Sequence, residues 1–464
     1  MNEMMNVGIL DTVVDSDLTS LQVGNSVFLN DFEKPIRDIT HGTVCALILT
    51  QYIDKADIKY LTILNKNGRG FVSEIDAFLQ KCLDKAIVII NMSFGTTHFL
   101  DKTYIKNTIN HYANKGLIIV AASSNDGFTT YPSSLSNVIS VACGDEFCVD
   151  EKLQRQKGID FIAPSDHEII IEGASFRLGR SNSYAAPYVT AMVGNLICEK
   201  GMMTVNEIRH ELAPHKEKFI YSPDWIERAW VSPECHRNNV GFYFKEDRRT
   251  LRECINYIDT LILCSPNEIE KYADLEKNIV YLGTEEVKVK PDIKYHFWSA
   301  SMRRKQVVTS PCKNDDFNIP VVFCMFDDNI DRIYCLCEMK KLFADDGYNA
   351  YSGCELIEAP LYDLEFLPPE KEVWGKLTDF IYWQTYYQQS DIVLIGMDSR
   401  EKFITIQDNT LDMLIEFKSA ENHVCVDITF ESIHSVSRSF QALDLNAIIE
   451  IYRDIINNFE KEDS

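Results

Sequence analysis

The sequence lacks the features by which several classes of protein are recognised. Its 14 cysteines include no C-x-x-C pair, so zinc-ribbon and thioredoxin-like redox sites have no support. No apolar run approaches the length needed to cross a bilayer, and there is no internal repeat or low-complexity tract. The first six residues carry one acid and no base, so we expect no secretory signal and no membrane span.

Basic residues are also few. Lys and Arg number 46 against 70 Asp and Glu, and the formal net charge is −24, of which residues 1–215 carry −7 and the remainder −17. This balance argues against nucleic-acid binding, which calls for a basic face. Attraction of a basic peptide and general solubility both agree with it. Without an export signal, we expect the cysteines to be reduced, mostly buried thiols of a cytoplasmic protein.

The composition that is present, 45% apolar and 25% charged, is that of a globular protein, and 464 residues favour two domains. In the first half, apolar strands alternate with helices, which predicts a mainly parallel sheet with helices on both faces. Reactive groups of such sheets collect at the carboxyl ends of the strands. The expected strands are 5–12, 58–65, 86–92, 117–122, 138–142 and 161–163, and the expected helices are 41–53, 71–84, 101–114 and two beginning near 183 and 204.

The second half alternates again and predicts a second α/β domain that is Rossmann-like. The turn after strand 319–326 carries Asp327 and Asp328 and lacks a Gly-rich loop, so we do not expect a nucleotide there. We therefore divide the chain into a first domain at 1–215, a linker region at 216–250, and an accessory domain at 251–464 that binds substrate or partner.

Three polar residues of the first half lie at the ends of expected elements. Asp11 ends the apolar run Val7-Gly8-Ile9-Leu10, His41 opens His-Gly-Thr, and Ser183 precedes Ala-Ala-Pro at a helix start. Alone, each has a plain interpretation as a turn cap, an ordinary histidine or a packing residue. Together, in this order, they are typical of a serine activated by a histidine that an aspartate orients.

With these motifs, residues 7–212 resemble the subtilisin-family (subtilase) serine proteases. The resemblance extends over the blocks 88–95, 120–127, 131–133 and 138–141. It implies a subtilisin-like fold and a serine endopeptidase whose catalytic residues are Asp11, His41 and Ser183. The sequence departs from the family pattern at Val13, Ser124, Asn182 and Tyr184, where the family has Gly, Gly, Thr and Met.

The resemblance also assigns binding residues. It gives Asn125 to the oxyanion hole, and in subtilisin the loss of such a donor costs roughly 10²–10³ in turnover. It places Thr130 at the floor of a moderate first specificity pocket. We expect the substrate to be an extended peptide or protein segment, with no metal and no cofactor. The resemblance implies that the substrate channel is lined by Ser93, Phe94, Gly95, Gly68, Arg69 and Gly70.

The leading hypothesis is an intracellular serine endopeptidase of narrow specificity. An example is a processing protease that removes the leader from a bacterial peptide precursor, helped by the acidic second half. The alternative is a non-catalytic peptide-binding module on a protease fold. An esterase or peptide ligase that uses the same acyl-enzyme stays open. The sequence leaves open the natural substrate, the cleavage site, the calcium dependence, any self-cleavage and the oligomeric state.

Overall fold

The computed structural model describes the residues listed at the end of this paragraph, and they form two compact units. Unit 1 comprises Met1–Ile220 with Asp224–Glu227 and Pro291–His296, and unit 2 comprises Tyr221–Pro223, Arg228–Lys290 and Phe297–Ser464. Each unit is taken by itself below. The described ranges are 4–15, 17–18, 27–28, 39–150, 157–171, 174–213, 222–287, 292–313, 315–400, 412–430 and 434–460.

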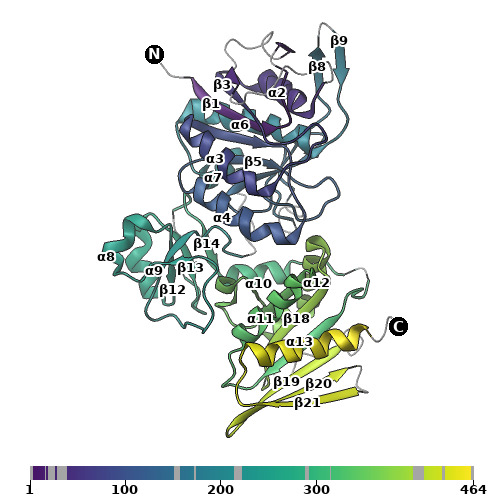
Figure 1. Cartoon of the computed structure of the whole chain (residues 1–464). Coiled ribbons are helices and arrows are strands. Elements are labelled where there is room, and N and C mark those ends of the chain that lie inside the picture. The colour runs from purple at the N-terminus through teal and green to yellow at the C-terminus, as the bar shows by residue number, and fades with distance from the viewer. Residues whose placement is uncertain are drawn as a thin grey trace. The chain divides into compact units, whose positions relative to one another are not determined.

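Unit 1 is built on a seven-stranded sheet with the order β2-β3-β1-β4-β5-β6-β7, in which every neighbouring pair is parallel. Figure 1 labels β1, β3 and β5 of this sheet. Its central strands are apolar and buried on both faces, as parallel strands under helices must be. A separate antiparallel hairpin pairs β8 with β9. The strands are β1 (Met5–Asp11), β2 (Val27–Phe28), β3 (Ala56–Thr62), β4 (Ile87–Met92), β5 (Ile118–Ala122), β6 (Val138–Gly144), β7 (Phe161–Pro164), β8 (Glu168–Ile171) and β9 (Ala174–Arg177).

Helices cover both faces of this sheet with two separate apolar clusters. One cluster joins the strands to α2 (His41–Tyr52), α6 (Asn182–Lys200) and α7 (Val205–Leu212). The other joins them to α3 (Ile75–Asp84) and α4 (Lys102–Ala113), with short 3₁₀ turns before each of these helices. The mainly parallel α/β sheet predicted for the first half is confirmed. Its strands β1 and β4 end beside the first turns of α2 and α6, which positions the site described below.

Unit 2 contains two sheets. The smaller is a five-stranded parallel sheet with the order β11-β10-β12-β13-β14. Its apolar cluster packs α8 and α9 against β12 and β13. The elements are β10 (Arg228–Val231), β11 (Lys245–Glu246), α8 (Leu251–Cys254), β12 (Thr260–Leu263), α9 (Pro266–Tyr272), β13 (Asn278–Tyr281) and β14 (Phe297–Ser299).

The larger sheet of unit 2 has the order β17-β16-β18-β15-β19-β20-β21. It is parallel from β17 to β19, and β20 and β21 then run antiparallel. Helices α10 and α12 share an apolar cluster with β15 and β18. The elements are α10 (Ala300–Val308), β15 (Val321–Phe326), α11 (Arg332–Asp345), β16 (Ala350–Cys354), β17 (Glu365–Phe366), α12 (Lys371–Gln388), β18 (Ile392–Asp398), β19 (Met413–Ala420), β20 (His423–Phe430), β21 (His434–Phe440) and α13 (Leu445–Glu460).

Most of the second half forms one compact unit, within which the strands divide between two sheets that were not predicted from the sequence. It has two sheets, because β14 and β15 are not paired, and a Rossmann-like arrangement is not confirmed. The expected linker at 216–250 includes β10 and β11, whose backbone groups are used in sheet pairing. Part of the expected linker, 216–221, lies outside the described residues.

Two further expectations concern cysteines and membranes. Cys235 and Cys264 form a disulfide with a Cα–Cα distance of 5.7 Å, so the expectation that all thiols are reduced was wrong for this pair. The ends of β10 and β12 bring these cysteines together, although 29 residues separate them in the sequence. The other 12 cysteines are free. Among the described helices, none is both long and apolar enough to cross a membrane.

Candidate active site

Asp11 is the last residue of β1 and its side chain is fully buried. Strands β3 and β4 flank β1 on either side, so the carboxylate emerges at the carboxyl edge of the sheet. One carboxylate oxygen accepts a hydrogen bond from the Thr12 N–H at 2.7 Å. The Val13 carbonyl accepts the hydroxyl of Thr40, and Val13 is not among the residues with positive φ, so valine fits this turn despite the family's glycine.

His41 is the first residue of α2, and Thr40 is the N-cap whose hydroxyl accepts the Thr43 N–H. The ring nitrogen Nδ1 of His41 lies 2.9 and 3.0 Å from the two carboxylate oxygens of Asp11. Gly42 is required by close approach, since a Cβ there would lie 2.3 Å from the Thr12 carbonyl oxygen. The helix start and the strand end are thus held together, and the imidazole is oriented by a buried carboxylate.

The protonation of His41 is set by opposing effects. Burial disfavours the charged ring, but hydrogen bonds with Asp11 and Cys45 raise the pKa of His41 above its ordinary value. Cys45 lies one turn along α2, with its sulfur 3.9 Å from Nδ1. Burial raises the pKa of Cys45, so at neutral pH it is a thiol and the Asp11 carboxylate is the charge that acts on the ring.

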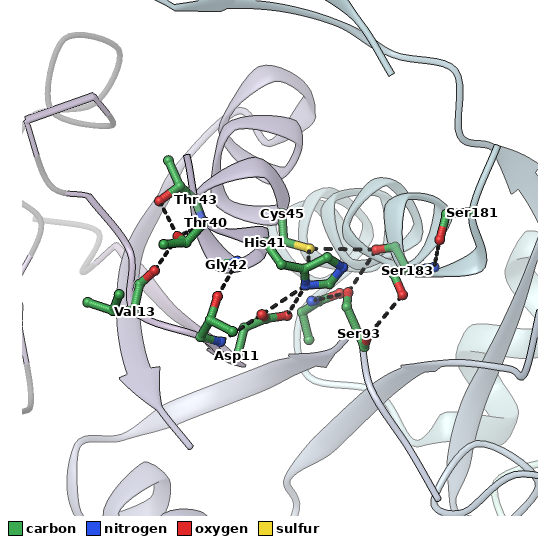
Figure 2. Close-up of polar contacts among 12 residues, drawn as sticks. Asp11, Val13, Thr40, His41, Gly42, Thr43, Cys45, Ser93, Ser181 and Ser183 are labelled. Carbon is green, nitrogen blue, oxygen red and sulfur yellow. Dashed lines mark hydrogen bonds and ion pairs between the residues drawn. The ribbon is translucent and has the colours of Figure 1, made fainter. Parts of the chain in front are cut away.

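Ser183 lies in the first turn of α6, where Ser181 is the N-cap and accepts the Ser183 N–H at 3.3 Å. The Ser183 hydroxyl donates to the carbonyl of Ser93 at 3.0 Å. Figure 2 shows the ring of His41 between the Asp11 carboxylate and Ser183. Among the described residues no hydrogen bond joins the hydroxyl to the ring. The arrangement brings the three predicted residues together with the serine in a resting rotamer.

Asn125 lies in the turn after β5, and its side-chain oxygen accepts the Asn182 N–H at 2.9 Å. That bond leaves the amide nitrogen as the group that can donate, and no acceptor takes it among the residues the structure describes. The first turn of α6 also favours negative charge, because the positive end of the helix dipole lies there. An exposed amide next to the first turn of α6 can therefore stabilise an oxyanion.

The predicted channel residues divide into two groups. Ser93 is 3% exposed, and its hydroxyl donates to the Ser183 carbonyl at 2.9 Å, so its side chain holds the segment of the nucleophile, and its place in the channel stays a prediction. Gly95 lies against Thr130, since a Cβ at Gly95 would meet the Thr130 methyl at 2.5 Å. Phe94 lies between Ser93 and Gly95 in the sequence and is partly buried. Gly95 and Thr130 are thus adjacent, as one channel wall requires.

The loop at Gly68, Arg69 and Gly70 is a tight turn. Gly68 has φ +72°, a left-handed conformation that favours glycine, and a Cβ at Gly70 would lie 2.7 Å from the Ile63 carbonyl oxygen. Arg69 is exposed. Within the described part of the chain, no hydrogen bond links this loop to His41 or Ser183, so its place in a channel stays a prediction.

Several site residues were missed by sequence reasoning. Cys45 could have been found, because its i+4 spacing from His41 places both side chains on one face of α2. The ring of Tyr184 stacks on His41 with centroids 5.6 Å apart. Asn91 donates to the Ser93 hydroxyl at 2.9 Å and Thr190 donates to Asn91 at 3.1 Å, which supports Ser93 from below. These last contacts join β4 to α6, and no local pattern reports them.

One group of metal-ligand type occurs among the described residues. Donor atoms of Asp11, His41 and Cys45 lie within 4.8 Å of one another. The Asp11–His41 hydrogen bond uses the same atoms. A soft metal ion bound there would displace the bond that orients the imidazole, so metal binding and base chemistry exclude each other at this place.

Comparison with known proteins agrees with the geometry. The model of the subtilase family matches residues 5–218. Residues 5–218 are a subtilase segment. Its motif residues Asp11, His41 and Ser183 all fall within the matched range.

The relatives of this subtilase segment are serine proteinases. The chain is 27% identical over 271 residues to a thermophilic serine proteinase of Bacillus sp. (strain AK1), covering 54% of this chain and 61% of that protein. It is 30% identical over 155 residues to thermitase of Thermoactinomyces vulgaris, covering 30% and 55%. The chain thus spans little more than half the length of these two relatives.

A solved structure of a cold adapted subtilisin-like serine proteinase also matches, with a TM-score of 0.36 and 18% identity, covering 44% of this chain and 79% of that chain.

Proposed function

We propose that the subtilase segment is a serine endopeptidase in which Ser183 attacks the peptide carbonyl. The observation that carries the proposal is the double contact of the buried Asp11 carboxylate with His41 Nδ1, at 2.9 and 3.0 Å, beside Ser183. That contact fixes the tautomer in which Nε2 is unprotonated and can accept a proton. A free serine hydroxyl is a weak nucleophile, so it needs such a base.

The proposed reaction begins with a change of rotamer. The Ser183 hydroxyl leaves the Ser93 carbonyl and donates to His41 Nε2, which accepts the proton as the oxygen attacks. The imidazolium is stabilised by Asp11 and then gives the proton to the leaving amine. The Asn125 amide donates to the tetrahedral oxygen, and the Ser183 N–H does the same after it leaves the Ser181 hydroxyl. Water then hydrolyses the acyl-enzyme with His41 again as the base.

The finer proposal is a cytoplasmic processing protease of narrow specificity, such as one that removes leaders from bacterial peptide precursors. Free thiols at 12 of the 14 cysteines favour a reducing compartment, and the Cys235–Cys264 pair is the observation against it. The −17 charge after residue 215 favours recognition of a basic peptide by the second half. Fractionation of the native cell, with the chain found outside the cytoplasm, would refute this location.

A fluorophosphonate probe tests the reaction. We expect the wild-type chain to be labelled at Ser183, with Ser183→Ala and His41→Ala unlabelled. Ser175→Ala on β9 is the matched control and keeps the label. An unlabelled wild-type chain that still binds an extended peptide would support the non-catalytic binding module.

A labelled chain leaves two acyl-enzyme chemistries to separate. We expect cleavage of peptide amides as well as of activated esters. Cleavage of esters alone would support an esterase, and acyl transfer to an added peptide amine in place of water would support a ligase. Mass spectrometry of peptides retained by Ser183→Ala in the native cell identifies the substrate.

A further inference from the structure

Asn182, the residue before the proposed nucleophile, uses its side-chain amide and its backbone N–H in hydrogen bonds inside the protein. The two hydrogens of its side-chain NH2 group are shared among three acceptors: the Ser123 carbonyl at 3.1 Å, the Ser123 hydroxyl at 3.0 Å and the Ser124 carbonyl at 2.9 Å. Its side-chain oxygen accepts the Cys143 N–H at 2.7 Å. Its backbone N–H donates to Asn125. Asn182 therefore joins the start of α6 to the turn after β5 and to the end of β6.

This side chain is 6% exposed, so its hydrogen bonds form in a site that water barely reaches. Buried hydrogen bonds are stronger than solvated ones, and breaking one leaves a polar group unpaired. The two carbonyls that Asn182 holds belong to Ser123 and Ser124, which directly precede Asn125. One residue thus fixes the backbone before Asn125 and the orientation of the Asn125 amide.

An oxyanion donor works only when it is already aimed at the place where charge develops. The Asn125 turn is exposed at its tip, and the contacts from Asn182 are what tie it to the helix of the nucleophile. A threonine, which the family has at this position, offers a single hydroxyl and cannot reach both the loop and β6. The asparagine is therefore a feature of this chain.

We propose that Asn182 is a positioning residue that holds the Asn125 amide in register with the Ser183 N–H. The inference rests on the proposed protease function. Asn182 in this role acts on the transition state and not on substrate binding, so its removal should lower kcat and leave KM unchanged.

The test compares Asn182→Ala with Asn195→Ala on the same helix. Asn195 also bonds two backbone groups, accepting the Asp54 N–H and donating to the Tyr52 carbonyl, both at 2.9 Å, but it lies some three turns away. We expect Asn182→Ala to lower kcat roughly 10- to 100-fold with KM within about twofold, as displacement of a catalytic group does. Asn195→Ala should lower the Tm and leave kcat unchanged.

A double-mutant cycle decides whether the effect passes through Asn125. In the Asn125→Ala background we expect Asn182→Ala to cost less than about twofold, because coupled residues are not additive. An unchanged kcat in Asn182→Ala, or an equal loss in both backgrounds, would overturn the inference. If Asn182→Ala does not fold, Asn182→Thr takes its place with the same criteria.

The wild-type chain separates the two proposals. If it is not labelled by fluorophosphonate and cleaves no peptide, the protease function fails. If it is active and the Asn182 variants equal it in kcat, only the positioning role fails.

Discussion

At the scale of single residues, the site depends on a few groups whose surroundings change their chemistry. Asp11 is buried and bonded to His41, and that bond keeps the imidazole oriented and favours its charged form. Cys45 shares the space beside the ring but is kept as a thiol by burial. The neighbours of each group therefore decide which one can accept a proton.

The raised pKa of His41 predicts the pH dependence of activity. The base must be neutral to accept a proton, so activity should fall as pH drops through a value above 6.5. Asp11→Asn removes the carboxylate that favours the charged form of His41, so the acid limb of the pH profile should move to lower pH. The same substitution should lower kcat by about 10⁴. Profiles of kcat/KM against pH for both chains check this, and coincident limbs would contradict it.

The Asn125 amide gives a second prediction at this scale. Asn125→Ala removes one donor to the tetrahedral oxygen, so kcat should fall roughly 10²–10³-fold with little change in KM. Steady-state kinetics on a chromogenic peptide measures it. The neighbouring Asp126→Ala is the control and should keep kcat. A loss seen mainly in KM would show that Asn125 binds substrate.

At the scale of elements, the site is held by the packing of α2 and α6 on one face of the sheet. His167, which is 4% exposed, joins them: its Nδ1 lies 3.0 Å from the Tyr52 hydroxyl and its Nε2 lies 3.1 Å from the Tyr184 carbonyl. The ring of Tyr188 stacks on it. The segment after the nucleophile thus rests on a buried neutral imidazole.

This buried imidazole predicts a loss of stability in acid. Burial lowers the pKa of His167, with the nearby Asp166 opposing, so below about 6.5 the unfolded chain binds a proton that the folded one does not. The free energy of unfolding should fall by up to about 1.4 kcal/mol per pH unit there. Urea unfolding at pH 7.5 and 5.5 measures this. The free energy of unfolding of His167→Gln should differ less between the two pH values than that of the wild-type chain. An equal difference would show that His167 is not the cause of the acid sensitivity.

The helix α7 is tied to the sheet by a buried ion pair. Arg209 binds both carboxylate oxygens of Asp160 at 3.0 Å, and it also donates to the Ser136 and Val138 carbonyls. Arg209→Met leaves that carboxylate buried with one partner fewer, so we expect a loss of about 3–5 kcal/mol. Thermal unfolding measures it. Arg177→Ala, which breaks an exposed pair with Asp166, is the control and should leave the Tm unchanged.

At the scale of the whole molecule, the compact unit that holds the site is not one continuous stretch of chain. Asp224–Glu227 and Pro291–His296 belong to unit 1. Trp225 is fully buried and stacks on His296 with centroids 4.7 Å apart. His296 in turn lies 2.8 Å from the Asn137 side chain. The expected domain limit at 215 therefore leaves out residues that complete this unit.

A cut at that limit should weaken the unit. Trp225→Ala leaves a large cavity and should cost about 3–5 kcal/mol, and a chain ending at residue 215 should lose at least as much. The half-life of fluorophosphonate labelling during heating measures both. Trp230→Ala in unit 2 is the control and should leave that half-life unchanged. A chain ending at residue 215 with full thermal resistance would contradict the prediction.

Local patterns predicted the first half well because its strands and helices have clear sequence signals. The run ending at Asp11 is apolar enough to be a strand buried on both faces. His41 opens α2 directly after its cap, and Ser183 lies in the first turn of α6, two residues after its cap. The second half was predicted less well. Its strands were found, but their division into two sheets depends on which edges pair, and periodicity carries no such information.

The sequence alone determined the types and the order of the chemical groups. A strand end and a helix start are local properties of the chain, and the Asp–His–Ser order is read directly along it. The tertiary structure alone decided which groups meet. It brought Asn182 to Ser123 and Cys143, Ser93 to Ser183, and Cys235 to Cys264. Those contacts join residues 29 to 90 positions apart, and only the folding of the backbone brings such residues within bonding distance.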